Sequence, residues 1–165
     1  MEDHQRKSTF NPSRKKWPKN FLRKDSESTE KPPTKTSDEA VERLDGIPGW
    51  LTLYGNNVAV QRLPHQEALQ QTISEGTKIV KDELEHFLAG RDKTSYLAAL
   101  KAAATSARWK ETKGAIETRK GPVNDATIQN VLQNLKAAML IEEKDGVYAI
   151  HDPMLRTVLL TSQIT

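Results

Sequence analysis

The segment 141–150 constrains the fold of this chain more than any other part of its sequence. Two runs of β-forming residues, Ile141-Glu142-Glu143 and Val147-Tyr148-Ala149-Ile150, flank Lys144-Asp145-Gly146. An Asp-Gly pair between such runs is a strong local signal for a tight hairpin, because Asp and Gly tolerate the positive φ angles of the turn. We therefore predict a two-stranded β-hairpin near the C-terminus.

Helical segments lie on both sides of this hairpin. Three amphipathic segments precede it, at about 95–105, 108–120 and 124–139, and Asp152-Pro153 opens another helix after it. The apolar positions at helical spacing are Tyr96, Leu97, Leu100, Ala104, Trp109, Thr112, Ile116, Ile128, Val131, Leu132, Leu135, Met139, Leu155, Val158 and Leu159. Three helices, a hairpin and a final helix are the order of a winged helix-turn-helix. The predicted fold class is mainly α with a two-stranded wing.

The N-terminal half divides into a polar tail and a helical segment. Residues 1–37 are rich in Ser, Thr, Lys and Pro and lack apolar periodicity, which predicts disorder. Beyond them, Gly46, Pro48 and Gly49 mark a turn before a short helix, and an apolar stripe over 66–89 predicts a long amphipathic helix. We expect a disordered basic tail at 1–37, a helical segment at 38–92 and the winged helix-turn-helix domain at 93–165.

The net charge of +3 is distributed unevenly. Residues 1–38 hold ten Lys/Arg and six Asp/Glu, whereas residues 39–165 hold fifteen and sixteen, so the folded part is close to neutral. The stretch 10–24 interleaves cations with aromatic rings, as in segments that bind single-stranded nucleic acid or an anionic surface. A solvated tail is the alternative. The candidate phosphate contacts are Arg14, Lys15, Lys16 and Lys19.

The composition excludes several classes of protein. The chain of 165 residues has no cysteine, which removes disulfide scaffolds and thiolate catalysis and suits a reducing compartment. No apolar run approaches the roughly 18 residues of a membrane span, and the N-terminus lacks the apolar centre of a signal peptide. We predict a soluble, cytoplasmic protein with no membrane span.

Sequence patterns for catalysis are absent. The chain has no GxxxxGK[ST] phosphate loop, no GxGxxG after a strand and no HExxH. Its histidines are scattered, and we interpret each as a surface or capping residue rather than a metal ligand. We therefore expect no catalytic residue, no metal site and no enzymatic activity. The four histidines are His4, His65, His86 and His151.

Two motifs carry a resemblance to a known family. The segment LDGIPGWLTLYG contains Gly46, Pro48 and Leu51 as a GxPxxL pattern, and the end of the chain contains a Tyr-x-Ile-x-Asp-Pro pattern at 148–153. Both patterns resemble the C-terminal lid and winged helix of the archaeal ATPase family, which belongs to the AAA+/STAND class. The resemblance covers about residues 39–160, in order.

The resemblance implies a part of a nucleotide-driven machine. In the parent family, which binds ATP, the proline of the GxP segment packs on the adenine, so Gly46, Ile47 and Pro48 are the implied nucleotide-sensing residues. The phosphate loop and the acidic Mg²⁺ strand that precede the lid in that family are missing here, and with them most affinity for a triphosphate. The resemblance thus implies a non-catalytic module without a cofactor of its own. Its partner is an ATPase core or another protein.

A winged-helix protein that binds DNA is the alternative hypothesis. The helix at 124–139 would then enter the major groove and the wing would contact the DNA backbone, with a cationic edge on the helix at 108–120. The electrostatics argue against this hypothesis, because the groove helix is neutral and the wing sequence 142–145 has a net charge of −2. The candidate DNA contacts are Arg108, Lys110, Lys113, Gln129, Asn130, Gln133 and Asn134.

Overall fold

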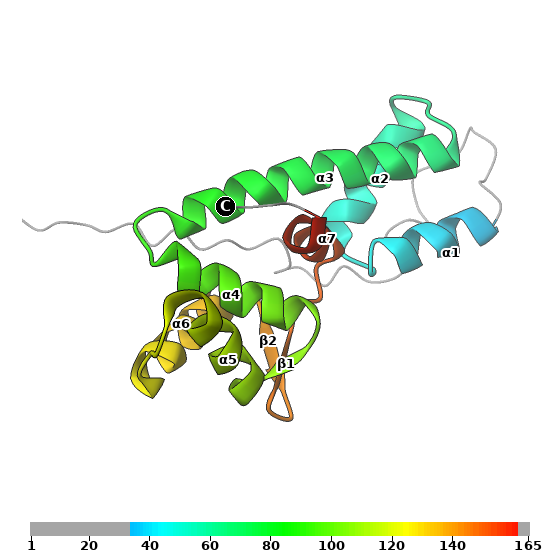
Figure 1. The fold of residues 1–165 in the computed structure, drawn as a ribbon. Coiled ribbons are helices and arrows are strands. Elements are labelled where there is room, and N and C mark those ends of the chain that lie inside the picture. Colours follow the sequence, from blue (N-terminus) through cyan, green and yellow to red (C-terminus); the bar gives the residue numbers. More distant parts are fainter. Residues whose placement is uncertain (1–33, 162–165) are drawn as a thin grey trace, which may run out of the picture. The chain divides into compact units, whose positions relative to one another are not determined.

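The computed structural model describes residues 34–161, and these form two compact units (Figure 1). The helical unit comprises residues 34–86 and 151–161, and the winged-helix-like unit comprises residues 87–150. The second unit is therefore an insertion in the chain of the first. The predicted tail contacts Arg14, Lys15, Lys16 and Lys19 lie outside the described residues.

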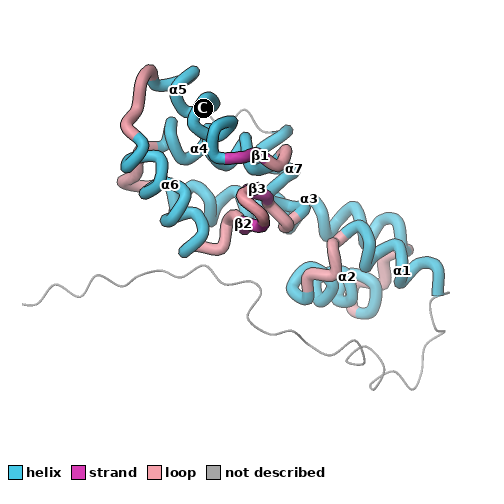
Figure 2. The backbone as a smooth tube through the Cα atoms, turned by 90° about the horizontal axis from the view of Figure 1, so that it is seen from below, coloured by secondary structure: helices cyan, strands magenta, loops and turns pink. Residues whose placement is uncertain are grey.

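The helical unit consists of four helices. They are α1 (Thr34–Arg43), α2 (Pro48–Ala59), α3 (His65–Leu88) and α7 (Pro153–Thr161), with the last two residues of α3 belonging to the other unit. The long helix α3 lies beside α2 and α7 (Figures 1 and 2). Leu44, Leu69, Leu84 and Met154 are among its fully buried side chains. Helix α1 begins within the segment predicted as tail, four residues before Asp38.

The winged-helix-like unit has three helices and a small sheet. In chain order these are α4 (Lys93–Ala104), β1 (Ala107–Arg108), α5 (Trp109–Lys120), α6 (Asp125–Ala137), β2 (Glu142–Lys144) and β3 (Val147–Ala149). The strands are antiparallel in the order β1-β3-β2. At the hairpin, Asp145 and Gly146 have φ angles of 53° and 73°, as a tight turn between twisted strands requires. The mainly helical fold with a hairpin wing is confirmed.

The structure differs from the sequence-based expectation at three places. Met139, expected in the buried stripe, follows the end of α6 with a φ of 57° and is 45% exposed. Strand β1 was not predicted, because two residues carry no periodic signal. The last helix, expected to close the winged-helix domain, is part of the helical unit. The physical reason is the set of contacts that α7 makes with Trp50 and Gly76.

Candidate functional site

The segment Gly46-Ile47-Pro48 forms a sharp corner between α1 and α2. The Gly46 N–H donates to the Val41 carbonyl (2.8 Å) and the Asp45 N–H to the Glu42 carbonyl (3.3 Å), which closes α1 in a Schellman motif. Pro48 occupies the first position of α2, where its missing N–H costs nothing. The corner is thus held by local backbone geometry. Ile47 and Pro48 are half-buried, and Gly46 is exposed.

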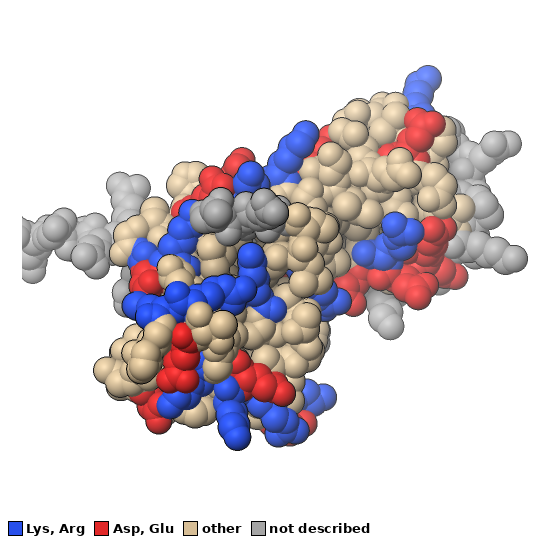
Figure 3. Space-filling model, in the orientation of Figure 1, with Lys and Arg blue, Asp and Glu red and all other residues tan. Residues whose placement is uncertain are grey.

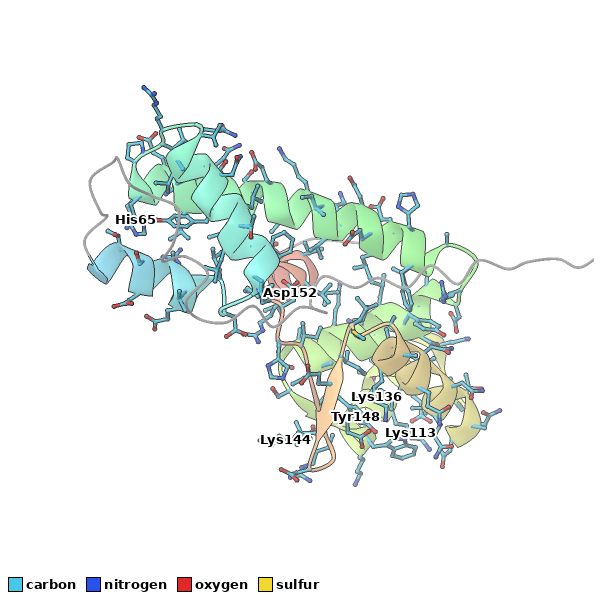
Figure 4. The ribbon with its side chains drawn as sticks, turned by 180° about the vertical axis from the view of Figure 1, so that it is seen from behind. His65, Lys113, Lys136, Lys144, Tyr148 and Asp152 are labelled. Carbon is cyan, nitrogen blue, oxygen red and sulfur yellow. The ribbon has the colours of Figure 1, made fainter. Side chains whose placement is uncertain are left out.

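Trp50, two residues after Pro48, connects this corner to α7. Its indole Nε1 donates to both carboxylate oxygens of Asp152, at 3.3 Å each. The Asp152 Oδ1 atom also accepts the backbone N–H groups of Met154 (2.8 Å) and Leu155 (3.3 Å), so the same carboxylate caps α7. The Asp152 side chain therefore joins the end of the Tyr-x-Ile-x-Asp-Pro motif to the GxPxxL segment that contains Trp50. Figure 4 shows Asp152 at the start of α7.

Gly76 in the middle of α3 makes room for this arrangement. A Cβ atom on Gly76 would lie 3.1 Å from Met154 Cγ and 3.2 Å from Trp50 Cζ3, closer than ordinary van der Waals contact. Trp50 and Met154 are both buried. Glycine at this position permits the close approach of α2 and α7 to α3. We call Trp50, Gly76, Asp152 and Met154 the Trp50 cluster.

Two carboxylates, one in the Trp50 cluster and one beside it, have raised pKa values. Burial raises the pKa of Asp152 above its ordinary value, against the opposing effect of the Met154, Leu155 and Trp50 donors. Burial, and then the charge of Asp152, also raise the pKa of Glu83 on α3. Ionised Asp152 is thus costly to bury and is retained by its three hydrogen-bond donors.

A second polar group joins the first three helices. The Tyr54 hydroxyl lies 2.7 Å from His65 Nδ1, and His65 Nε2 lies 3.0 Å from Glu39 Oε2. The Tyr54 and His65 rings meet edge to face, and Gln66 also donates to Glu39. Sequence analysis treated His65 as a surface or capping residue, but its side chain is only 16% exposed and contacts α1 and α2.

The pKa shift of Glu39 fixes the direction of its hydrogen bond with His65. Burial and the Glu39 charge raise the pKa of the Tyr54 hydroxyl, which therefore stays protonated at neutral pH. Hydrogen bonds from His65 and Gln66 lower the pKa of Glu39, which stays ionised. Because an ionised carboxylate only accepts hydrogen bonds, His65 Nε2 donates to Glu39 Oε2. The arrangement orients α1 and has a structural role.

The predicted groove helix, α6, exposes amide side chains. Gln129, Asn130, Gln133 and Asn134 are all exposed, as expected for the outer face of an amphipathic helix. Asn134 is engaged internally, because its Nδ2 donates to the hydroxyl of buried Tyr96 at 2.7 Å. The other three amides remain on the surface, where they can meet a partner.

The cations at both ends of α6 are held by carboxylates of the same unit. Lys113 Nζ lies 2.7 Å from Asp125 Oδ1, and Lys136 Nζ lies 2.5 Å from Glu143 Oε2. The Asp125 and Glu143 hydrogen bonds raise the pKa of the respective lysines, which stay charged but paired. Lys113, a predicted DNA contact, is therefore neutralised within the unit. Arg108 and Lys110 form no ion pair with another residue in the range 34–161 and are exposed.

Sequence analysis missed the contacts that depend on distant residues. No local pattern identifies Trp50 as the partner of Asp152, Gly76 as a contact of Met154, or His65 as a bridge between helices. Within the described part of the chain, no group of three or more His, Asp or Glu side chains could hold a metal ion. No helix in the same range is both long and apolar enough to cross a membrane.

Comparisons with known proteins give a likeness among solved structures. No family model matches the chain, and no curated protein matches its sequence. Among solved structures, a Walker-type ATPase of Pyrococcus abyssi is similar, with a TM-score of 0.66 and 28% sequence identity. The likeness covers 79% of this chain, which spans only 37% of that ATPase. These values support a relationship between this chain and archaeal ATPases.

Proposed function

We propose that this chain is the non-catalytic lid and winged-helix region of an archaeal AAA+/STAND-type ATPase and acts as a regulatory or protein-interaction module. The likeness of 79% of the chain to 37% of a Walker-type ATPase carries the proposal. The sequence contains no phosphate-loop pattern, so in this proposal the triphosphate is bound by an ATPase core outside the given sequence. That core is the partner.

The Trp50 cluster supports a regulatory role. Pro48, the implied nucleotide sensor, begins the helix that carries Trp50, and Trp50 is bonded to the cap of α7. Helix α7 is the first element after the inserted winged-helix-like unit. A ligand that shifts the corner at Pro48 therefore changes the hydrogen bonding of Asp152 through the Trp50 side chain.

An ATPase assay with the pure chain and with a partner core tests the proposal. The partner is an archaeal Walker-type ATPase from which the region similar to this chain has been removed. We expect no hydrolysis by the chain alone and a changed hydrolysis rate when it is added to the core. Pro48→Ala should weaken this change, whereas Pro64→Ala, at an exposed proline before α3, should leave it intact.

Two results would overturn the proposal. Hydrolysis by the pure chain that Pro48→Ala abolishes contradicts the non-catalytic role. Sedimentation that detects no complex between the chain and the core, with or without ATP, contradicts the partner.

A further inference from the structure

The pleat of the small sheet sorts the wing residues into two faces. Arg108 of β1 and Lys144 of β2 both stand opposite Val147 of the central strand β3. Side chains of one cross-strand row point to the same face. The neighbouring row, through Tyr148, points to the other face, where Tyr148 is buried. Arg108 and Lys144 therefore share the outer face of the sheet, and both are exposed.

Figure 4 agrees with this assignment, since Lys144 lies on the opposite side of the wing from Tyr148 and Lys136. Neighbouring strands are about 4.8 Å apart, so the backbones of Arg108 and Lys144 are separated by about 10 Å. At this separation the two long side chains can reach successive phosphates of a polyanion that repeats its phosphates along a backbone.

The acidic residues of the wing are sorted in the same way. Glu143 belongs to the Tyr148 row and is paired with Lys136. Glu142 lies on the outer face as well, two residues before Lys144 in β2 and opposite Ala149. On the outer face of the paired strands, Arg108 and Lys144 stand with Glu142, a net charge of +1, whereas Glu143 lies on the other face.

The winged-helix-like unit is also basic as a whole. It holds ten Lys/Arg and seven Asp/Glu, a net charge of +3, whereas the described residues of the helical unit hold six and ten, a net charge of −4. Figure 3 shows Lys and Arg side chains in a row over α4. The near-neutral total of the folded chain conceals two units of opposite sign.

Three cations of the sheet region are not used internally. Arg108, Lys144 and Lys110, in the first turn of α5, form no ion pair with another residue that the structure describes, and all are exposed. Lys113, Lys120 and Lys136 are each paired. Fixed carboxylates compete with phosphate for the paired lysines. The Glu111 carboxylate beside Arg108 is bonded to the Arg108 backbone N–H (2.7 Å).

We propose that Arg108, Lys110 and Lys144 form a phosphate-binding strip through which the winged-helix-like unit binds the backbone of duplex DNA. The inference goes beyond the proposed function and does not depend on it. Phosphate contacts supply most non-specific affinity for DNA, whereas an amide-bearing helix supplies little without them. The exposed amides Gln129, Asn130 and Gln133 on α6 thus have a secondary role in affinity.

Fluorescence anisotropy with a labelled DNA duplex of about 20 base pairs, roughly two helical turns, tests the strip. The full chain is titrated at several NaCl concentrations. All samples carry alanine at Arg14, Lys15, Lys16 and Lys19, so that tail cations do not dominate the signal. Each phosphate contact contributes about 0.9 to the slope of log affinity against log salt concentration.

The test variant is Arg108→Gln/Lys144→Gln, and the matched control is Lys113→Gln/Lys136→Gln. Both remove two positive charges, but the control removes them from lysines that are already paired. We expect the test variant to reduce the salt slope by about 2 and to weaken binding at low salt by about tenfold or more. The control should change both quantities by much less, with circular dichroism unchanged in each case.

Three outcomes would overturn the proposal. Equal losses in the two double variants indicate that only net charge matters. A lack of binding at low salt by the parent protein removes the interface altogether. Competition by poly-glutamate as strong as by unlabelled DNA of equal charge indicates an acidic protein as the partner. Because this assay contains neither ATP nor an ATPase core, its failure leaves the proposed function unaffected.

Discussion

Replacing Gly76 by alanine tests the packing of the Trp50 cluster. In an exposed helix interior, Gly→Ala normally stabilises by about 0.5–1 kcal/mol, because glycine loses more backbone entropy on folding. At Gly76 the added Cβ would meet Met154 Cγ at 3.1 Å and Trp50 Cζ3 at 3.2 Å. Met154 can change its rotamer, but the Trp50 ring is rigid and its Nε1 is bonded to Asp152.

Overpacking of this kind costs about 1–3 kcal/mol, which exceeds the helix-propensity gain. We therefore expect Gly76→Ala to lower the free energy of unfolding by about 1–2 kcal/mol, from the difference of the two effects. Urea titrations followed by far-ultraviolet circular dichroism and tryptophan fluorescence measure the change. Two probes are needed because the two units need not unfold together.

Gly114→Ala is the matched control, since Gly114 lies inside α5 and has open space around it. It should stabilise the protein by about 0.5–1 kcal/mol. Combining Gly76→Ala with Met154→Ala should cost less than the sum of the two single changes, because the shortened side chain vacates the contact. The reasoning is refuted if Gly76→Ala stabilises the protein as much as Gly114→Ala does.

Changes at three further positions test individual contacts. Asp152→Ala should destabilise the helical unit by about 1 kcal/mol through the lost cap, with Asp152→Asn closer to wild type. The folded-state pKa of Asp152 is raised, so ionisation of its carboxyl lowers the free energy of unfolding. As the pH falls from the folded-state pKa to the ordinary aspartate value, the wild-type protein should therefore become more stable relative to Asp152→Asn, as measured in unfolding titrations. Asn124→Ala removes the acceptor of the Thr127 N–H (2.8 Å) and should lower stability by about 1 kcal/mol, with faster amide exchange at the start of α6. Glu39 has a lowered folded-state pKa, so its stabilising contribution is complete above the ordinary glutamate value and is lost as the pH falls through the folded-state value. Glu39→Gln should therefore flatten the acid limb of stability against pH, and an unchanged limb contradicts the His65 contact.

The local elements of this chain follow from its sequence. The Asp145-Gly146 turn, the cap of α6 at Asn124 and the apolar period of that helix each depend on residues a few positions apart. Backbone sterics, capping and amphipathic spacing act over the same short range, so these elements were predicted with nearly their observed limits. The lack of a phosphate-loop pattern can also be read from the sequence alone, because that pattern is a short local motif.

Only the tertiary structure decided how these elements are grouped. Trp50 and Asp152 are 102 residues apart in sequence, yet their hydrogen bond helps to hold α7 in the same unit as α2 and α3. The same grouping separates a near-neutral chain into a basic and an acidic unit, and the strand register separates Lys144 from Glu143. Packing of large side chains against glycine and pairing of strands are long-range interactions, and sequence periodicity carries no record of which partner each face will meet.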